Sequence, residues 1–479
     1  MNFKKGLILV NVLVFGTIAI IITVALVRWV GTVIAATRQL SAREQAFHIA
    51  EAGIDYYRWH LAHAPTDYTN GTTTPGPYNF PFTDKDGNRI GQYSLSITPP
   101  PIGSTVVTIV ATGTVDAYPG VARAIRAQLA IPSLAKFAVV ANDVMRFGAG
   151  TEVFGPIHSN DGIRFDGIAH NLITSSVASY NDPDNPGPLR FGVYTTDSPT
   201  DPSPPAAVPN RPDVFMAGRQ FPLPESDFVG LTTDLAQMKA DAQANGRYFA
   251  SSGSQGYRVL LKTDDTFDLF RVNTLITPGS NCTRQSGEPT GSGWGSWSIN
   301  TQTFIGNYAL PANGIIFLED HVWVEGQINT ARVTIVAARF PINSSTYRSI
   351  TINNDLLYTN YDGRDVVALV AQNNINAGLR SEDDLRIDAA LIAQNGRVGR
   401  YYYQNSGSGS SSCQGFHDRS VITLYGMIAS NKRYGFSYTD GTGYDIRNII
   451  YDANLLYAPP PSFPLTTDQY SIISWEEVK

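Results

Sequence analysis

The sequence predicts an α+β protein that is mostly β: a long N-terminal helix, a small antiparallel sheet and a large β-rich domain of the right-handed β-solenoid kind with an irregular insertion. Three observations support this fold class. An uncharged apolar run over residues 7–27 continues into a stretch without proline up to Pro65. Glycine (42), proline (29) and tyrosine (24) are abundant, which favours turns and strands. Short apolar segments that close on a small residue and then Asn recur from residue 138 onward.

The first element is expected to be one continuous helix. Residues 7–28 are long enough to cross a bilayer, and they follow a short cytoplasmic leader, residues 1–6, that carries basic side chains. From residue 29 to 64, apolar residues return mostly three, four or seven apart, which is the stripe of an amphipathic helix. The positive residues before the run favour a cytoplasmic N-terminus and an exported C-terminal region. A secretory signal peptide has a shorter apolar core than this one.

The N-terminus resembles that of type IV pilus assembly proteins of the PilX type, which are minor pilins, and the similarly built type II secretion pseudopilin K. Lys5, Gly6, the aliphatic helix and the segment 45–53 (QAFHIAEAG) carry the resemblance. It implies that a prepilin peptidase cuts after Gly6, so that the mature chain begins at Leu7. Asn11 stands at the fifth mature position, where major pilins carry Glu, and this departure resembles minor pilins and K-type pseudopilins that sit at a filament tip.

The same resemblance implies that the helix is an assembly element. Residues 7–27 would pack with the helices of other pilins in the inner membrane and in the filament. In the exported half, Phe47, Glu51, Gly53 and Tyr57 belong to this assembly helix, and Asn11, Glu51 and Gly53 would shape the local contact. A single-pass membrane-anchored binding protein that never enters a filament is the alternative, with the same topology.

Beyond a turn-rich linker at residues 65–81, a small β headpiece is expected over residues 82–132. Three segments there, 89–98, 106–115 and 122–131, contain period-two alternation of apolar and polar residues. They predict a three-stranded antiparallel sheet packed on the stripe of the exported helix.

The large β-rich domain is expected over residues 137–180 and 311–450, as stacked coils. The segments at 138–142, 368–373, 390–395 and 426–431 share the small-residue and Asn ending, and Ala371 and Ala393 lie 22 residues apart, close to one solenoid coil. Small residues would let coils stack closely, and the Asn side chains would form a ladder. A β-sandwich of short strands is the alternative. Residues 181–310 form the predicted insertion, with a Pro-rich segment, a short helix and a hairpin, and residues 451–479 an extended C-terminal tail.

Two residue groups in Gly/Ser-rich segments are candidate sites. Cys282 and Cys413 are expected to form a disulfide outside the cytoplasm, the alternative being two unpaired thiols. Clustered rings stack on sugars or anchor protein interfaces, so they suggest a surface carbohydrate or protein ligand, unless they only cover the fold. These aromatic candidates are Trp294, Trp297, Tyr401, Tyr402 and Tyr403.

Charge and motifs argue against several other functions. A net charge of −6 with 16% charged residues gives no reason to expect nucleic acid, and the seven histidines lack metal-ligand spacing. The acidic pairs and triplet at 319–320, 382–384 and 476–477 are adjacent in sequence, so on a strand they point to opposite faces and do not flank a glycosidic bond. We therefore expect a non-enzymatic minor pilin-like membrane protein without cofactor or metal, acting at a filament tip in assembly priming or surface adhesion. A β-helix carbohydrate-active enzyme is the less favoured alternative.

Overall fold

The computed structural model describes residues 3–101, 103–133, 135–228, 230–277, 282, 296–404, 413, 415–463, 465 and 469–478, with the backbone alone for residues 3–7 and 230–234. The chain divides into two compact units. The first, here called the helix–sheet unit, comprises residues 1–131 and 468–479, and the second, the inserted unit, comprises residues 132–467. The inserted unit therefore interrupts the helix–sheet unit in sequence.

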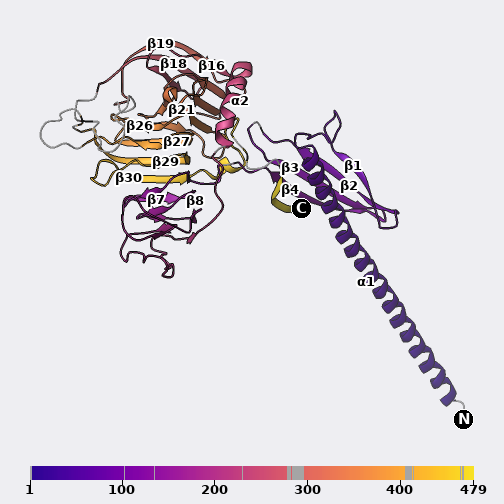
Figure 1. Cartoon of the computed structure of the whole chain (residues 1–479). Coiled ribbons are helices and arrows are strands. Elements are labelled where there is room, and N and C mark those ends of the chain that lie inside the picture. The colour runs from indigo at the N-terminus through magenta and orange to yellow at the C-terminus, as the bar shows by residue number, and fades with distance from the viewer. Residues whose placement is uncertain are drawn as a thin grey trace. The chain divides into compact units, whose positions relative to one another are not determined.

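The helix–sheet unit pairs one long helix with a five-stranded antiparallel sheet (Figure 1). Helix α1 runs from Phe3 to His63. The sheet has the order β1-β2-β3-β4-β31, in which β31 comes from the C-terminus and pairs with β4. The strands are β1 (Tyr78–Thr83), β2 (Arg89–Thr98), β3 (Val107–Val115), β4 (Tyr118–Ala130) and β31 (Ser471–Val478).

The core of this unit lies between the second half of α1 and one side of the sheet. Apolar positions of α1, among them Ile49, Ile54 and Leu61, are buried against alternate residues of β2, β3 and β4. Strand β3 shows why the sheet forms, because its residues alternate strictly between buried and half-buried positions. Gly113 of β3 lies directly under the helix, where an added Cβ would overlap the carbonyl oxygen of Ala46. A glycine at this position lets the backbone of the helix touch the sheet.

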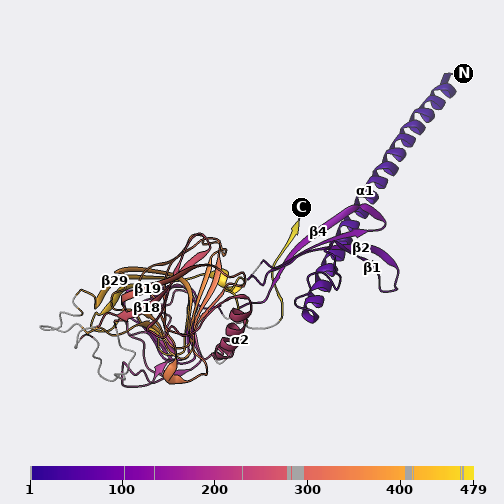
Figure 2. The ribbon, with the colours of Figure 1, turned by 90° about the horizontal axis from the view of Figure 1, so that it is seen from above.

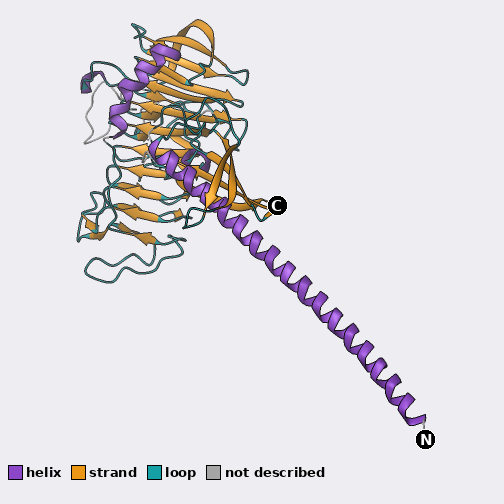
Figure 3. Ribbon diagram, turned by 90° about the vertical axis from the view of Figure 1, so that its right-hand side faces the viewer, coloured by secondary structure: helices purple, strands orange, loops and turns teal. Residues whose placement is uncertain are grey.

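The inserted unit is a stack of parallel coils with three faces (Figure 3). Each coil contributes a strand to the first face, and these strands pair in parallel register along the stack. In spatial order they are β16 (Arg247–Phe249), β20 (Ile315–Leu318), β22 (Arg332–Ala337), β25 (Val366–Ala371), β27 (Asp384–Ala393), β29 (Asp418–Ser430), β5 (Val139–Ala141), β8 (Ile157–Ser159), β11 (Ile173–Ser175) and β15 (Arg219–Gln220). The solenoid-like stacking agrees with the prediction, whereas its right-handedness stays a prediction.

The second and third faces complete each coil. The second face contains parts of β27 and β29 together with β17 (Gly256–Leu261), β21 (Val322–Ile328), β24 (Leu356–Tyr358), β30 (Gly443–Tyr451), β7 (Thr151–Phe154) and β10 (Ile168–Ala169). The third face contains the start of β21 with β23 (Ile350–Thr351), β26 (Ile375–Ala377), β28 (Val398–Arg400), β6 (Met145–Phe147), β9 (Ile163–Phe165) and β14 (Val193–Tyr194). Antiparallel additions are β18 (Thr266–Leu275), β19 (Ile299–Ala309), and the pair β12 (Ser179–Tyr180) and β13 (Arg190–Phe191).

The small-residue pattern of the sequence is the inner column of the first face. Register places Ala371 beside Ala393, Ala393 beside Ser430, and Ser430 beside Ala141 and then Ser159. All of these residues are buried. The predicted stacking of these segments is thereby confirmed.

The predicted Asn ladder forms in the lower coils. The Asn142 amide donates to the Asn431 side chain at 2.9 Å, and the Asn160 amide donates to the Asn142 side chain at 2.8 Å. In the upper coils Gln372 and Gln394 follow the small residue instead, and the Asn395 amide donates to the Gln372 carbonyl oxygen at 2.8 Å. The ladder thus spans only the coils in which Asn comes directly after the small residue.

The chain enters this stack in its middle. Strand β5, the first of the unit, lies beside β29, which comes almost last, and β7 lies beside β30. The chain then runs to the end at β15 and resumes at the other end with β16, so that the C-terminal coils return to the start. Strands β15, β16 and β17 fall within the predicted insertion at 181–310, and the structure corrects that boundary because they are coils of the stack. They are short or lack the small-residue and Asn ending, which is why the pattern did not include them.

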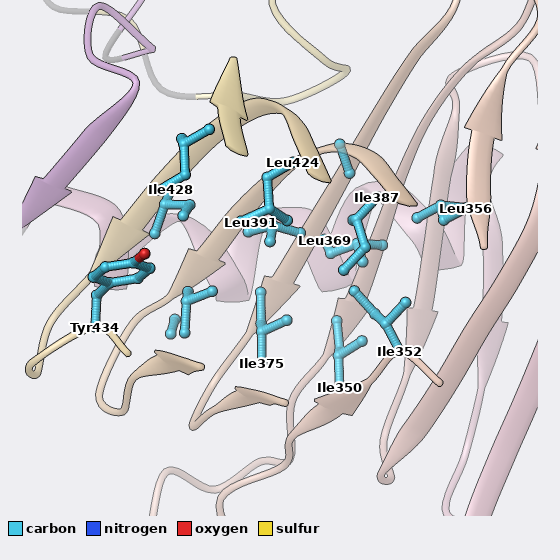
Figure 4. Packing of buried hydrophobic residues seen from close by; sticks show 14 of the residues in the cluster. Ile350, Ile352, Leu356, Leu369, Ile375, Ile387, Leu391, Leu424, Ile428 and Tyr434 are labelled. Carbon is cyan, nitrogen blue, oxygen red and sulfur yellow. The ribbon is translucent and has the colours of Figure 1, made fainter. Parts of the chain in front are cut away.

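The first face is buried on both sides. Its inner side faces a core of aliphatic residues from all three faces, including Leu369, Leu391 and Ile428 (Figure 4). Its outer side is covered by α2 (Gly230–Asn245), which lies beside the stack (Figure 2) and runs across the strands, and by Leu455 and Phe463. Two short 3₁₀ turns, η1 (Ser344–Thr346) and η2 (Ala453–Leu456), complete the described elements. Burial on both sides explains the continuous apolar runs in these strands.

Candidate functional site in helix α1 and the inserted unit

The first half of α1 is an exposed apolar surface. Every described side chain from Ile8 to Ser41 is exposed, including large aliphatic ones such as Leu9, Ile21 and Val27. The helix from Ile8 onward contains a window with a mean hydropathy of 2.7 and is long and apolar enough to cross a membrane. Asn11 is exposed within this run. Lys5, Gly6 and Leu7 lie within α1, but the structure describes only their backbone.

The threonine hydroxyls in this half donate hydrogen bonds within the helix. The hydroxyl of Thr17 donates to the Leu13 carbonyl oxygen at 2.8 Å, and that of Thr23 to the Ala19 carbonyl oxygen at 2.7 Å. In lipid, where water cannot serve as a partner, such internal hydrogen bonds remove the cost of a polar hydroxyl. The uncharged run that ends at Val27 is therefore suited to an apolar environment.

The second half of α1 packs most of its predicted assembly residues against the sheet of its own unit. Tyr57 is buried, its hydroxyl donates to the Asp67 carbonyl oxygen at 3.0 Å, and burial raises the pKa of its phenol. Gly53 is buried under Tyr93, whose ring would lie 3.0 Å from an added Cβ. Both residues lie on the apolar stripe that faces the sheet of their own unit, and their part in an assembly contact stays a prediction.

Phe47 and Glu51 lie at the edge of that packing. The Phe47 ring is half-buried, with the Arg123 guanidinium 5.1 Å from its centroid and the Trp475 ring edge-on at 5.7 Å. Glu51 points outward and lies 2.9 Å from the His48 imidazole. Of the four predicted residues, Glu51 is the one whose charged group remains open to a neighbour.

Strand β31 fastens the C-terminus to this unit. Glu476 accepts a hydrogen bond from Arg126 of β4 at 3.0 Å, and Glu477 pairs with Arg123. The predicted tail at 451–479 is thus divided: its last part is a strand of the helix–sheet sheet, and residues 453–463 pack on the inserted unit. Both glutamates serve cross-strand ion pairs, which suits a structural role.

The cysteine and aromatic candidates form one buried cluster in the inserted unit. Cys282 and Cys413 form a disulfide with Cα atoms 5.3 Å apart. Trp297 (7% exposed), Tyr401 (6%) and Tyr403 (1%) pack around it. The prediction that these three rings are exposed for a ligand is wrong, because the disulfide holds their Gly/Ser-rich segments against the coils.

The two remaining aromatic candidates differ. Tyr402 is half-buried, and its hydroxyl donates to Asp440 at 2.7 Å. Trp294 lies outside the described residues. Neither therefore adds an exposed ring surface to the described part of this cluster.

The acidic candidates for catalysis are engaged in separate contacts. Glu319 pairs with Lys239, and Asp320 accepts a hydrogen bond from the Ser252 backbone at 2.9 Å. The pKa of Glu382 is raised by its partial burial and by the neighbouring Asp355. Within the described residues, no group of three His, Cys, Asp or Glu side chains is placed to hold a metal ion.

The outer side of the second face carries exposed rings and an exposed aliphatic side chain that the sequence did not reveal. Tyr361 is 45% exposed, Phe154 42% and Ile446 48%. Phe154 and Ile446 occupy outward positions of β7 and β30, where the neighbouring inward residues are buried. The sequence signal for these residues is an apolar residue at an outward position of a strand with period-two alternation. Which positions point outward can be decided only once the strand register is known.

Comparison with known proteins gives a structural likeness but no match in sequence. No protein-family model matches the chain, and no curated protein matches it. Among solved structures, the competence-associated pilin ComZ from Thermus thermophilus is similar at 15% identity, covering 91% of this chain and 98% of that chain with a TM-score of 0.29. A likeness at this score carries no inference, so fold and function rest on the geometry of the chain itself.

Proposed function

We propose that this protein is a membrane-anchored, non-enzymatic minor pilin-like subunit of a type IV pilus or a related secretion pseudopilus. The single observation that supports this most strongly is the division of α1. One half is apolar, exposed and free of charge from residue 8 to 27, and the other half is packed on an antiparallel sheet. A helix built in this way can leave lipid and pack with similar helices, because its apolar side chains stay in an apolar environment throughout.

The proposed position is the filament tip. Asn11 lacks the carboxylate that in polymerising pilins meets the N-terminal amine of a neighbouring subunit. The inserted unit of residues 132–467 is also far larger than the helix–sheet unit that carries it. One such unit at an end leaves the packing of the shaft undisturbed, so the role is assembly priming, surface adhesion or both.

The experiment is mass spectrometry of the N-terminus after co-expression with a prepilin peptidase. We expect a mature chain that begins with a methylated Leu7. A Gly6→Leu variant should retain the leader, whereas Gly31→Leu, at a glycine in the same helix with open space around it, should be processed normally. An intact Met1 in the wild type contradicts the pilin role and favours the single-pass anchored binding protein.

The tip position has its own test. Gold-labelled antibody against the inserted unit should mark filament ends in cells that express the full chain. Label spread evenly along the shaft contradicts the tip position while leaving the pilin role intact.

A further inference from the structure

The outer side of the second face is organised as two parallel columns of side chains. In β29, β30 and β7 the residues Leu424, Ile449 and Val153 point inward and are buried, while their neighbours point outward. Register therefore aligns the outward residues of successive coils. This side is not covered by α2, which lies on the first face.

The first column, here called the ring column, consists of Tyr361, Tyr425, Ile450, Phe154 and His170. Tyr425 pairs in register with Ile450, and Ile450 with Phe154. The His170 ring stacks on Phe154 with centroids 4.0 Å apart and planes 13° apart. At the other end the Tyr361 ring lies edge-on to Tyr425 at 5.1 Å. At about 4.8 Å per strand, the column extends roughly 19 Å along the stack.

The second column, here called the polar column, runs beside it. Register aligns Arg386, Thr423, Asn448 and Glu152 on successive coils. Side chains two residues apart on a strand point the same way about 7 Å apart, so Thr423, Asn448 and Glu152 lie beside Tyr425, Ile450 and Phe154, whereas Arg386 lies beside Asp388. The Asn448 amide donates to the Thr423 hydroxyl at 3.4 Å, which leaves its carbonyl oxygen for another partner.

The charges of the two columns compensate each other. Arg386 donates to Asp388 at 2.9 Å, and the His170 ring lies 3.0 Å from Glu152. Within these columns no described cation lacks a facing carboxylate. A polyanion needs unpaired cations along its backbone, so this surface does not suit a nucleic acid or an acidic polysaccharide.

We infer that the two columns bind a neutral, linear glycan chain that lies along the stack. The exposed parts of the rings and an aliphatic side chain form an apolar strip that sugar rings can contact, and hydroxyl and amide groups beside this strip bind sugar hydroxyls. On three successive coils, β29, β30 and β7, a polar-column residue lies beside a ring-column residue, and this repeat along the stack suits a linear polymer. This assignment names the ligand of the adhesive role and rests on that part of the proposed function.

The test uses the full-length protein in detergent micelles and isothermal titration calorimetry with chitohexaose and with cellohexaose. We expect at least one hexaose to bind with a Kd of about 1 mM or tighter. Phe154→Thr should weaken binding about tenfold, because it removes the most accessible ring of the column and keeps a residue suited to strands. Phe304→Thr is the matched control, since Phe304 is 55% exposed on β19, outside both columns, and its removal should leave the Kd unchanged.

A second variant separates binding from folding. Asn448→Ala removes a polar-column amide at a half-buried position, and it should also weaken binding, with an unchanged thermal unfolding midpoint. Binding of neither hexaose by the wild type overturns the inference. So does equal binding by the Phe154 and Phe304 variants, or binding only of duplex DNA or alginate that salt abolishes. An intact Met1 would contradict the pilin role without changing these titrations, whereas loss of glycan binding leaves processing at Leu7 unchanged.

Discussion

Gly113 offers the sharpest test of how α1 is held on its sheet. An added methyl group at this position would lie 2.6 Å from the Ala50 amide nitrogen and overlap the Ala46 carbonyl oxygen, where ordinary contacts begin at 3.4 Å. Both atoms belong to the helix backbone, which cannot rotate aside as a side chain does. Gly113→Ala therefore pushes the helix away from the sheet by about an ångström.

A shift of that size weakens the whole interface. A radial gap of 0.5–1 Å forfeits roughly a quarter to a half of each dispersion contact, and overpacking costs about 1–3 kcal/mol. We expect a cost near the upper end, about 3 kcal/mol, because Ile49, Ile54 and Leu61 all depend on the same approach. At 1.4 kcal/mol for each factor of ten, this is a roughly 150-fold gain in the population of opened states.

Hydrogen–deuterium exchange of the full-length protein in micelles measures this gain. Peptides from residues 45–63 and from β3 should exchange about 150-fold faster in Gly113→Ala than in the wild type. Gly120→Ala is the matched control, because Gly120 lies in the same sheet with open space around it, and it should exchange no faster than the wild type. Equal exchange in the two alanine variants would refute the close-approach explanation.

Three further outcomes follow from single contacts. Asp67 accepts hydrogen bonds from the Thr69 backbone and from neighbouring groups, and these bonds hold the pKa of its carboxyl below 3.8. The stabilisation that Asp67 provides is therefore present above that pH and is lost as pH falls through the folded-state pKa. Urea titrations should show Asp67→Ala less stable than the wild type at pH 7 and equally stable in strong acid. Burial, aided by Arg348, lowers the pKa of His321 to about 4, so the unfolded chain binds the proton first and the inserted unit should lose stability as pH falls from 6.5 to about 4. His321→Gln should flatten that pH dependence, and an unchanged slope contradicts the assignment. Replacing Cys282 and Cys413 by Ser should lower the free energy of unfolding of the inserted unit by about 2–4 kcal/mol, seen as a lower urea midpoint that reducing agent reproduces in the wild type.

The elements that the sequence predicted well are those whose signal is local. The apolar run and the stripe of α1, and the alternation of β2 and β3, each follow from neighbours within one element. The sequence pattern also predicts the coils from β22 to β29, because small residues must recur where coils stack closely.

The features that the sequence did not reveal depend on contacts between distant segments. Residues 138–142 carry the same ending as residues 426–431, yet no sequence feature near either segment indicates that β5 lies beside β29. Trp297 and Tyr401 are surrounded by glycine and serine, which suggested exposure, but a disulfide between distant segments buries them. The ring column has the same origin, since Tyr425 and Phe154 become neighbours only through the register of β30.

The place of the insertion connects these observations. Strands β4 and β31 are antiparallel and pair Ala130 with Ser471, so the chain leaves and re-enters the helix–sheet unit at the same end of the sheet. The inserted unit is therefore attached by two chain segments, and the second of them continues into a strand fixed by Arg123 and Arg126. A pull on the inserted unit acts on both segments together, which opposes detachment better than a single linker does. Because the inserted unit interrupts the helix–sheet unit in sequence, the last strand of the helix–sheet unit is made from the end of the chain.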